Sequence, residues 1–249
     1  MNRPQLEQGD SDLLTDKRKL FIELASRYAS YAKEAGIGVI PYHHESLPSF
    51  SSLTLPEQSR ILQALSQRIS ICESAAAQGG SMSDAPTLTW AALKSFGLRP
   101  PSDLFSRIQA DSIIEIHSPD GKPIFQSFNY YEFCSYSLEE IYCGHWSTLY
   151  TRPDSVSSLL TDFATRVYSG ELEGIVPLDV PVHVVHETHS IRKFAIELTL
   201  QWGAALYPVG SSAAGASIVI DRARLAPQPS PTPTDSKQAE LTQPLSALR

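Results

Sequence analysis

Two short strands joined by a tight turn, within residues 112–128, constrain the fold of this chain more than any other segment. Residues 113–116 (IIEI) form an apolar run that is typical of a strand. Ser-Pro-Asp-Gly follows at 118–121, where Pro fixes one φ angle and Gly accepts a positive one, as a tight turn requires. Residues 123–128 are predicted to return as a second strand. We therefore expect a β-hairpin.

Helix signals follow the hairpin. Asn129 is a suitable N-cap for one short helix, and Ser137 with Glu140 three residues later forms a capping box for a second. The order of these features resembles the first half of a PAS domain: a hairpin with an Asp-Gly turn, an Asn after it, Tyr-Ser-x-Glu-Glu-Ile, a Gly and Trp-x-x-Leu. The resemblance implies a sensory or partner-binding module and does not identify the ligand.

The later part of the chain continues the same pattern. Residues 155–169 have a helical apolar stripe, and residues 175–185 are strand-like, although Pro177 and Pro181 favour an edge or bulged strand. The strongest alternation lies at 194–202, and a last strand is predicted at 216–221. We expect an α+β fold in which a PAS-like, five-stranded antiparallel sheet, at about 112–224, carries short helices on one face, with the helices at 129–143 and 155–169 both packed on that face.

The first hundred residues are predicted to be helical. Apolar residues recur at helical spacing in 16–35 and again in 55–77, where Thr54 and Glu57 form a capping box. Two antiparallel helices packed on each other are expected, followed by helices at about 87–96 and 104–110. The predicted organisation is a mobile N-terminus (1–11), a helical N-terminal region (12–100), a PAS-like domain (101–225) and a disordered Pro-rich tail (226–249).

Composition narrows the classes of function. The net charge of −7 and the pI near 5.5 argue against nucleic acid as the main partner, because phosphate binding needs a basic surface. The sequence has neither an apolar leader nor an apolar run of about 20 residues, so we expect an intracellular, cytoplasmic protein without a membrane segment. Its three cysteines have no Cys-x-x-Cys spacing, which argues against disulfides and a zinc site.

Histidine and cysteine patterns offer no catalytic or metal-binding motif. His183, His186 and His189 are spaced so that His186 would point away from the other two on a strand, and the metal-binding motif His-Glu-x-x-His is absent there. Exposed histidines are the favoured interpretation, and no metal is predicted. Cys134 and Cys143 lack a motif that supplies a base, so burial as small apolar residues is favoured over catalysis.

Two cofactors known from PAS domains lack their ligands in this sequence. The flavin-binding, light-sensing type carries Gly-x-Asn-Cys-Arg-Phe; aligned on Gly144, the Asn position is Trp146 and the photoreactive Cys position is Ser147. Haem-binding PAS domains of the oxygen-sensor type carry an axial His in the long helix, and residues 155–169 contain none. Cysteinyl-flavin and haem are therefore disfavoured, although His145 is an alternative axial ligand. The cofactor stays unidentified.

Aromatic residues are the candidates for a ligand site. In a PAS-like fold they would converge between the sheet and the short helices, and a filled aromatic core is favoured there over a ligand cavity. The residues that we predict to contact a small ligand are Phe128, Phe133, Tyr136, Trp146, Leu198 and Trp202. Leu198 is placed on the apolar side of the strand at 194–202.

The favoured function is a non-catalytic PAS-like sensory or protein-interaction module in signal transduction, which binds a small ligand or acts through contacts with another protein or a second copy of itself. One alternative is a transcription or stress regulator that acts through its N-terminal helices. Another is a small α+β enzyme that uses His145 or His186 in a cavity. The bulky residues Phe21, Tyr28 and Tyr31 also predict a homodimer formed through the N-terminal helices.

Overall fold

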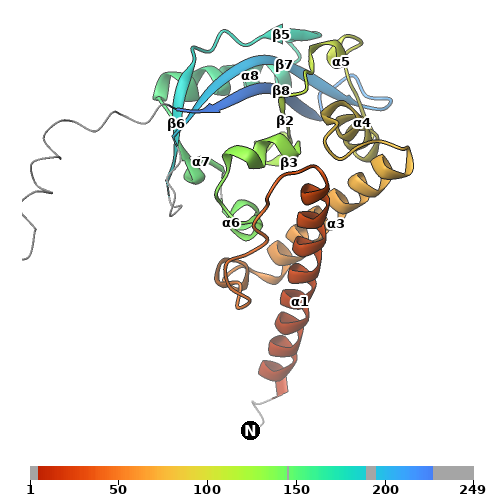
Figure 1. Cartoon of the computed structure of the whole chain (residues 1–249), viewed down its shortest axis with the longest axis vertical. Coiled ribbons are helices and arrows are strands. Elements are labelled where there is room, and N and C mark those ends of the chain that lie inside the picture. The colour runs from red at the N-terminus through yellow and green to blue at the C-terminus, as the bar shows by residue number, and fades with distance from the viewer. Residues whose placement is uncertain (1–4, 145, 189–194, 227–249) are drawn as a thin grey trace, which may run out of the picture.

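The computed structural model of the chain describes residues 5–144, 146–188 and 195–226. It confirms an α+β fold in which helices and a curled antiparallel sheet are combined (Figure 1). The predicted Pro-rich tail, apart from residue 226, lies outside the described residues, as do His145 and His189.

The N-terminal region is helical, as predicted. It contains α1 (Gln5–Glu34), α2 (Pro48–Ser51), α3 (Leu55–Ala77) and α4 (Ala85–Ser95). The capping box of Thr54 and Glu57 at the start of α3 is confirmed. The helix α1 begins at Gln5, well before the residues whose apolar stripe predicted it, and ends just before Gly36, which has a φ of 82°.

The helices α1 and α3 pack on each other, as their matching apolar stripes predicted. Two of the three bulky residues of α1, Phe21 and Tyr28, are buried within the same chain, and Tyr31 is partly buried. The Phe21 ring lies 4.9 Å from the ring of Phe50, and the Tyr28 ring lies 5.3 Å from the ring of Phe128. Packing within one chain therefore explains the bulky side chains of Phe21 and Tyr28. The homodimer stays a prediction, and these contacts do not support it.

The sheet has eight strands where five were predicted, in the order β3-β2-β8-β7-β6-β4, with β1 and β5 also paired to β7. Every pairing is antiparallel. The bounds are β1 (Leu98–Arg99), β2 (Ile113–His117), β3 (Pro123–Gln126), β4 (Tyr150–Thr151), β5 (Ile175–Pro177), β6 (His183–Glu187), β7 (Ala195–Pro208) and β8 (Ala216–Leu225).

The additional strands have physical causes. The strand expected at 175–185 is split into β5 and β6, because Pro177 and Pro181 cannot donate hydrogen bonds to a sheet ladder. The strands β1 and β4 have two residues each, which is too short to show an alternating pattern in the sequence. Both halves of the split strand pair with β7, so the long β7 bridges the break.

The remaining helices connect the strands. They are α5 (Leu104–Arg107), the 3₁₀ helix η1 (Phe128–Phe133), α6 (Leu138–Cys143), α7 (Trp146–Leu149) and α8 (Asp154–Ser169). The predicted capping box of Ser137 and Glu140 is confirmed at the start of α6. The long helix α8 was expected at almost the same residues, and it ends at Gly170, which has a φ of 79°.

The two faces of the sheet carry separate apolar clusters. Ile114 and Ile116 of β2 belong to the larger cluster, which includes buried residues of α1, α3, α4, η1 and α6. Glu115 and His117 alternate with them along the strand and face the opposite side. That side is covered by α8, which runs along β7 (Figure 1). The smaller cluster there is formed by Val156, Phe163, Val167, Leu172, Leu200, Ala205 and Val219.

Gly203 of β7 lies where α8 comes closest to the sheet, and this contact leads to a prediction. A Cβ atom at Gly203 would lie 2.5 Å from two ring carbons of Phe163. Gly203→Val is therefore expected to displace α8 and to lower the free energy of unfolding by about 2 kcal/mol, as overpacked cores do. Urea denaturation measures this change. Gly38→Val is the control, because a Cβ there meets nothing within 4 Å; equal losses in both variants would contradict the close contact.

Candidate ligand-binding cavity

A partly open cavity of about 740 Å³ lies over the sheet face that α8 covers. Its lining includes β2, β3, β7 and β8, one side of α8, the C-terminal end of α6 and the residues around β4. It also extends past the edge strand β3 to α3. A volume of this size is typical of a site for a small organic ligand.

One wall of the cavity is apolar. The helix α8 contributes Leu160, Phe163 and Ala164, and the strand β7 contributes Leu198 and Leu200. These side chains sit in the cavity because α8 turns its apolar stripe toward the sheet, while β7 alternates its residues between the two faces. The wall therefore suits an apolar or aromatic part of a ligand.

The floor of the cavity carries charged side chains from the two central strands. Glu115 and His117 are neighbours on the same face of β2, and the Nε2 atom of His117 lies 3.2 Å from Oε2 of Glu115. Asp221 lines the cavity from β8 and is only 4% exposed. The Oδ1 atom of Asp221 is buried, and no hydrogen-bond partner for it is found among the described residues. A buried carboxylate oxygen without a partner is costly.

The two carboxyl groups have opposite pKa shifts. Burial raises the pKa of Asp221 well above its ordinary value, the negative charge of Glu115 raises it further, and Arg152 opposes this shift. Burial also opposes ionisation of Glu115, but the hydrogen bond and charge of His117, with the charge of Arg152, lower its pKa. As the pH rises, Glu115 is therefore the first of the pair to ionise, and Asp221 holds its proton to a higher pH.

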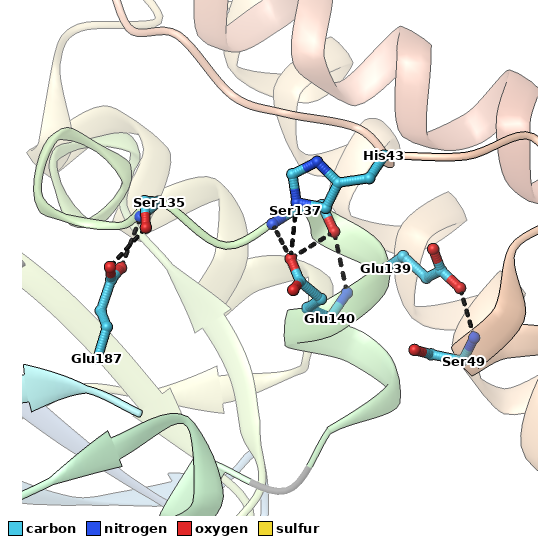
Figure 2. Close-up of polar contacts among 7 residues, drawn as sticks. All are labelled: His43, Ser49, Ser135, Ser137, Glu139, Glu140 and Glu187. Atoms are coloured by element: carbon cyan, nitrogen blue, oxygen red, sulfur yellow. Dashed lines mark hydrogen bonds and ion pairs between the residues drawn. The ribbon is translucent and has the colours of Figure 1, made fainter. Parts of the chain in front are cut away.

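The helix α6 joins the cavity to the N-terminal region. Its C-terminal residues line the cavity, whereas its N-terminal end is bonded to the segment 40–50. The backbone N–H of Leu138 donates to the carbonyl of Ile40 at 2.8 Å. The Oε1 atom of Glu139 accepts from the backbone N–H groups of Ser49 at 2.8 Å and Phe50 at 3.1 Å. Figure 2 shows Glu139 directed toward Ser49, with His43 beside Glu140 at 3.1 Å.

The residues that precede α6 are bonded to the sheet. Glu187, at the end of β6, is buried, and its carboxylate accepts from the backbone N–H of Ser135 at 2.6 Å and from its hydroxyl (Figure 2). The residues leading into α6 are thus held on one side by β6 and on the other by the N-terminal region.

The structure separates the six predicted ligand-contacting residues. Leu198 lines the cavity. Phe128 and Tyr136 are buried in the larger apolar cluster, where the Tyr136 hydroxyl donates to the carbonyl of Leu149 at 2.6 Å. Trp202 packs beneath Arg107, whose guanidinium carbon is 4.3 Å from the ring centre. Phe133 ends η1 and is partly buried, and the side chain of Trp146 lies outside the described part of the structure.

The charged residues of the cavity were not singled out from the sequence. Glu115, His117 and Asp221 occupy positions of their strands that face away from the isoleucines of the larger apolar cluster, and such positions are usually solvated. The alternation itself was visible in the sequence. The prediction that the helix at 155–169 packs on the same face as the short helices is wrong, because α8 packs on the opposite face of the sheet, over these charged residues.

His183, His186 and Cys134 do not line this cavity, whereas Cys143 lines it from the end of α6. His183 is buried on β6, with Nδ1 2.9 Å from the carbonyl oxygen of Pro181, and His186 is exposed on the opposite face of the strand. Burial raises the pKa of Cys134 to about 11 and that of Cys143 to about 12, so both are thiols at neutral pH. In the described residues, no group of three or more His, Cys, Asp or Glu is placed to hold a metal ion.

Comparison with models of known protein families finds no match, and a search of curated proteins finds no significant match. Within the described ranges, no helix is both long and apolar enough to cross a membrane.

Proposed function

We propose that this chain is a non-catalytic, PAS-like sensory module that binds a small ligand in the cavity beneath α8 and passes the signal to its N-terminal helices. The observation that carries this proposal is the cavity of about 740 Å³, which combines an apolar wall with a buried, unpartnered carboxylate oxygen. Such a combination favours a bound molecule over a filled core, because an empty cavity forfeits packing and leaves the carboxylate oxygen unsatisfied.

The order of the elements supports the PAS-like part of the proposal. A hairpin (β2 and β3) is followed by short helices, a long helix (α8) and a final group of strands. The split of one strand and the two very short strands are local departures from the five-strand pattern. The function proposed for the module depends little on them, because β1, β5 and β6 do not line the cavity and β4 contributes only Tyr150.

The route of the signal is proposed from the contacts of α6. One end of this helix lines the cavity, and its other end is held to the segment 40–50 by two backbone hydrogen bonds and by the carboxylate of Glu139. A ligand that displaces α6 would therefore displace that segment as well. The N-terminal helices would then present a changed surface to a protein partner. Such a change is how a signalling module passes on the binding of its ligand.

Filling the cavity should prevent ligand binding. Ala164 of α8 lines the cavity, so Ala164→Trp is expected to occupy the space without removing a polar group. We expect native mass spectrometry of the full chain, as purified, to show an added small-molecule mass in the wild type that is absent from this variant. Thr165→Trp, at an exposed position of the same helix, is the matched control and should keep the added mass.

Two results would contradict the proposed function. One is an added mass that survives in Ala164→Trp, because the ligand would then lie elsewhere. The other is a wild-type chain that carries no added mass and binds no compound of a fragment library in ligand-observed NMR.

A second candidate function, proton transfer to a substrate, is favoured by the pair formed by His117 and Glu115. A histidine held by a carboxylate is the usual arrangement of a general base. Of the histidines first considered for catalysis, His186 is exposed on β6, and His145 lies outside the described residues. Conversion of a bound compound to a new mass, in place of its retention, would distinguish this candidate from the sensory one.

A further inference from the structure

We propose that the ligand carries a cationic amine on an aromatic or otherwise apolar body, and that the cation lies between Asp221 and Glu115. This inference rests on the proposed function, because it assigns the chemistry of the molecule that the cavity holds. It adds a specific anchor, a pair of carboxyl groups on adjacent central strands.

The position of the two carboxyl groups follows from the strand register. Ile113 pairs with Asp221, and Glu115 pairs with Val219, so Glu115 and Asp221 are diagonal neighbours on the same face. Diagonal neighbours on adjacent antiparallel strands are about 7–8 Å apart at their Cα atoms. One ammonium group fits between two carboxyl groups at such a separation and donates to both, since it has three N–H bonds.

The surroundings of Asp221 leave one of its oxygens for the ligand. Glu115 faces it from β2, and Arg152 approaches from beyond β4. His117, which pairs with Ser217, and Tyr168, whose hydroxyl lies 3.4 Å from the Ser217 hydroxyl, are four residues farther along β8. His117 is held by Glu115, and the Tyr168 hydroxyl donates to the carbonyl of His117 at 3.2 Å. The Oδ1 atom of Asp221 has no partner among the described residues. A ligand ammonium satisfies this atom and offsets the repulsion between the two carboxylates.

The apolar wall favours an apolar or aromatic body for the part of the ligand beyond its amine. Leu160 and Phe163 of α8 face Leu198 and Val219 across the cavity, above the charged floor. An aromatic ring placed against these side chains removes apolar surface from water and leaves the amine directed toward the sheet. Arg152 disfavours a ligand with two positive charges, so a monoamine is the fitting class.

Binding of a cation is coupled to a proton. Because burial and Glu115 raise the pKa of Asp221, its carboxyl group holds its proton to a higher pH than an ordinary Asp when no ligand is bound. The ligand ammonium replaces that proton, and the amine itself stays protonated up to about pH 10. Affinity is therefore expected to increase as the pH rises toward the pKa of Asp221. A ligand that instead accepts a hydrogen bond from the protonated carboxyl group would bind more weakly as the pH rises.

The test uses the full chain and three probes that share one aromatic body: tryptamine (cationic), tryptophol (neutral) and indole-3-acetate (anionic). Isothermal titration calorimetry is expected to show that tryptamine binds at least about tenfold more tightly than tryptophol, the value of one charge-assisted hydrogen bond. Asp221→Asn should remove this preference and leave tryptophol unchanged. Asp162→Asn, at an exposed position of α8 that does not line the cavity, should retain it.

Proton release gives an independent readout if Asp221→Asn does not fold. Titrations of the wild type in buffers with different ionisation enthalpies are expected to show protons released on binding tryptamine and none on binding tryptophol. Equal affinities for the three probes, or a preference for indole-3-acetate, would overturn the assignment of a cation but leave the ligand-binding function standing. Failure of all three probes to bind would count against both.

Discussion

Leu200→Asp is expected to unfold the sheet. Leu200 is only 5% exposed, packs in the cluster beneath α8 and pairs with Asp221 on the neighbouring strand. The new carboxylate would lose the apolar contacts of Leu200 and bring a third acidic group beside Asp221 and Glu115. We expect the free energy of unfolding to fall by more than about 4 kcal/mol, a large share of the stability of a typical domain. Circular dichroism and urea denaturation measure this loss.

Two controls make the result specific to that position. Leu198→Asp lies two residues away on the same face, but Leu198 is only partly buried beside the open cavity, so a smaller loss is expected. Val209→Asp, at a position that is 73% exposed, should change stability little. A Leu200→Asp chain with wild-type stability would show that α8 does not cover this face of the sheet.

Glu139→Ala is expected to loosen the junction between the N-terminal region and the sheet-bearing part of the chain. The Glu139 carboxylate is 3% exposed and accepts hydrogen bonds from the backbone N–H groups of Ser49 and Phe50. Removing it leaves these two donors without their acceptor. Since each bond to a charged group is worth about 1.5–3 kcal/mol, we expect a loss of about 3 kcal/mol in the free energy of unfolding.

Hydrogen exchange measured by mass spectrometry locates that effect. Exchange should increase in the segment 40–54 and little elsewhere. Glu139→Gln keeps one acceptor oxygen and is expected to lose about half as much, whereas Glu132→Ala, at an exposed position of η1, should lose almost nothing. If Glu139→Ala exchanged like the wild type across 40–54, the route proposed for the signal would lose its main anchor.

Local signals in the sequence predicted most helices and the larger strands. The capping boxes at Thr54 and Ser137 mark the starts of α3 and α6, because they satisfy backbone N–H groups that every helix start leaves free. The alternation in β7 and the stripe of α8 were equally clear. The two-residue strands were not predictable, because they exist only through their partners on β6 and β7.

The cavity was harder to predict from the sequence than the fold. A polar residue on a strand looks the same in sequence whether it faces water or a covered cavity. Glu115 and Asp221 become notable only because the chain places α8 above them and because β2 and β8, about a hundred residues apart, are neighbours. The residues first favoured for ligand contact were chosen mainly because they are aromatic. Phe128 and Tyr136 instead pack within the larger apolar cluster.

The central position of β8 has a consequence for how the chain is synthesised. The strand β8 lies between β2 and β7, so β2 and β3 have no link to the rest of the sheet until residues 216–225 exist. His117 pairs with Ser217, so roughly 100 residues must be added between these partners. At about 5–20 residues per second on the ribosome, this takes about 5–20 s. Throughout that interval the edge of β2 lacks its strand partner on the nascent chain, and an unpaired strand edge is a template for pairing with other chains.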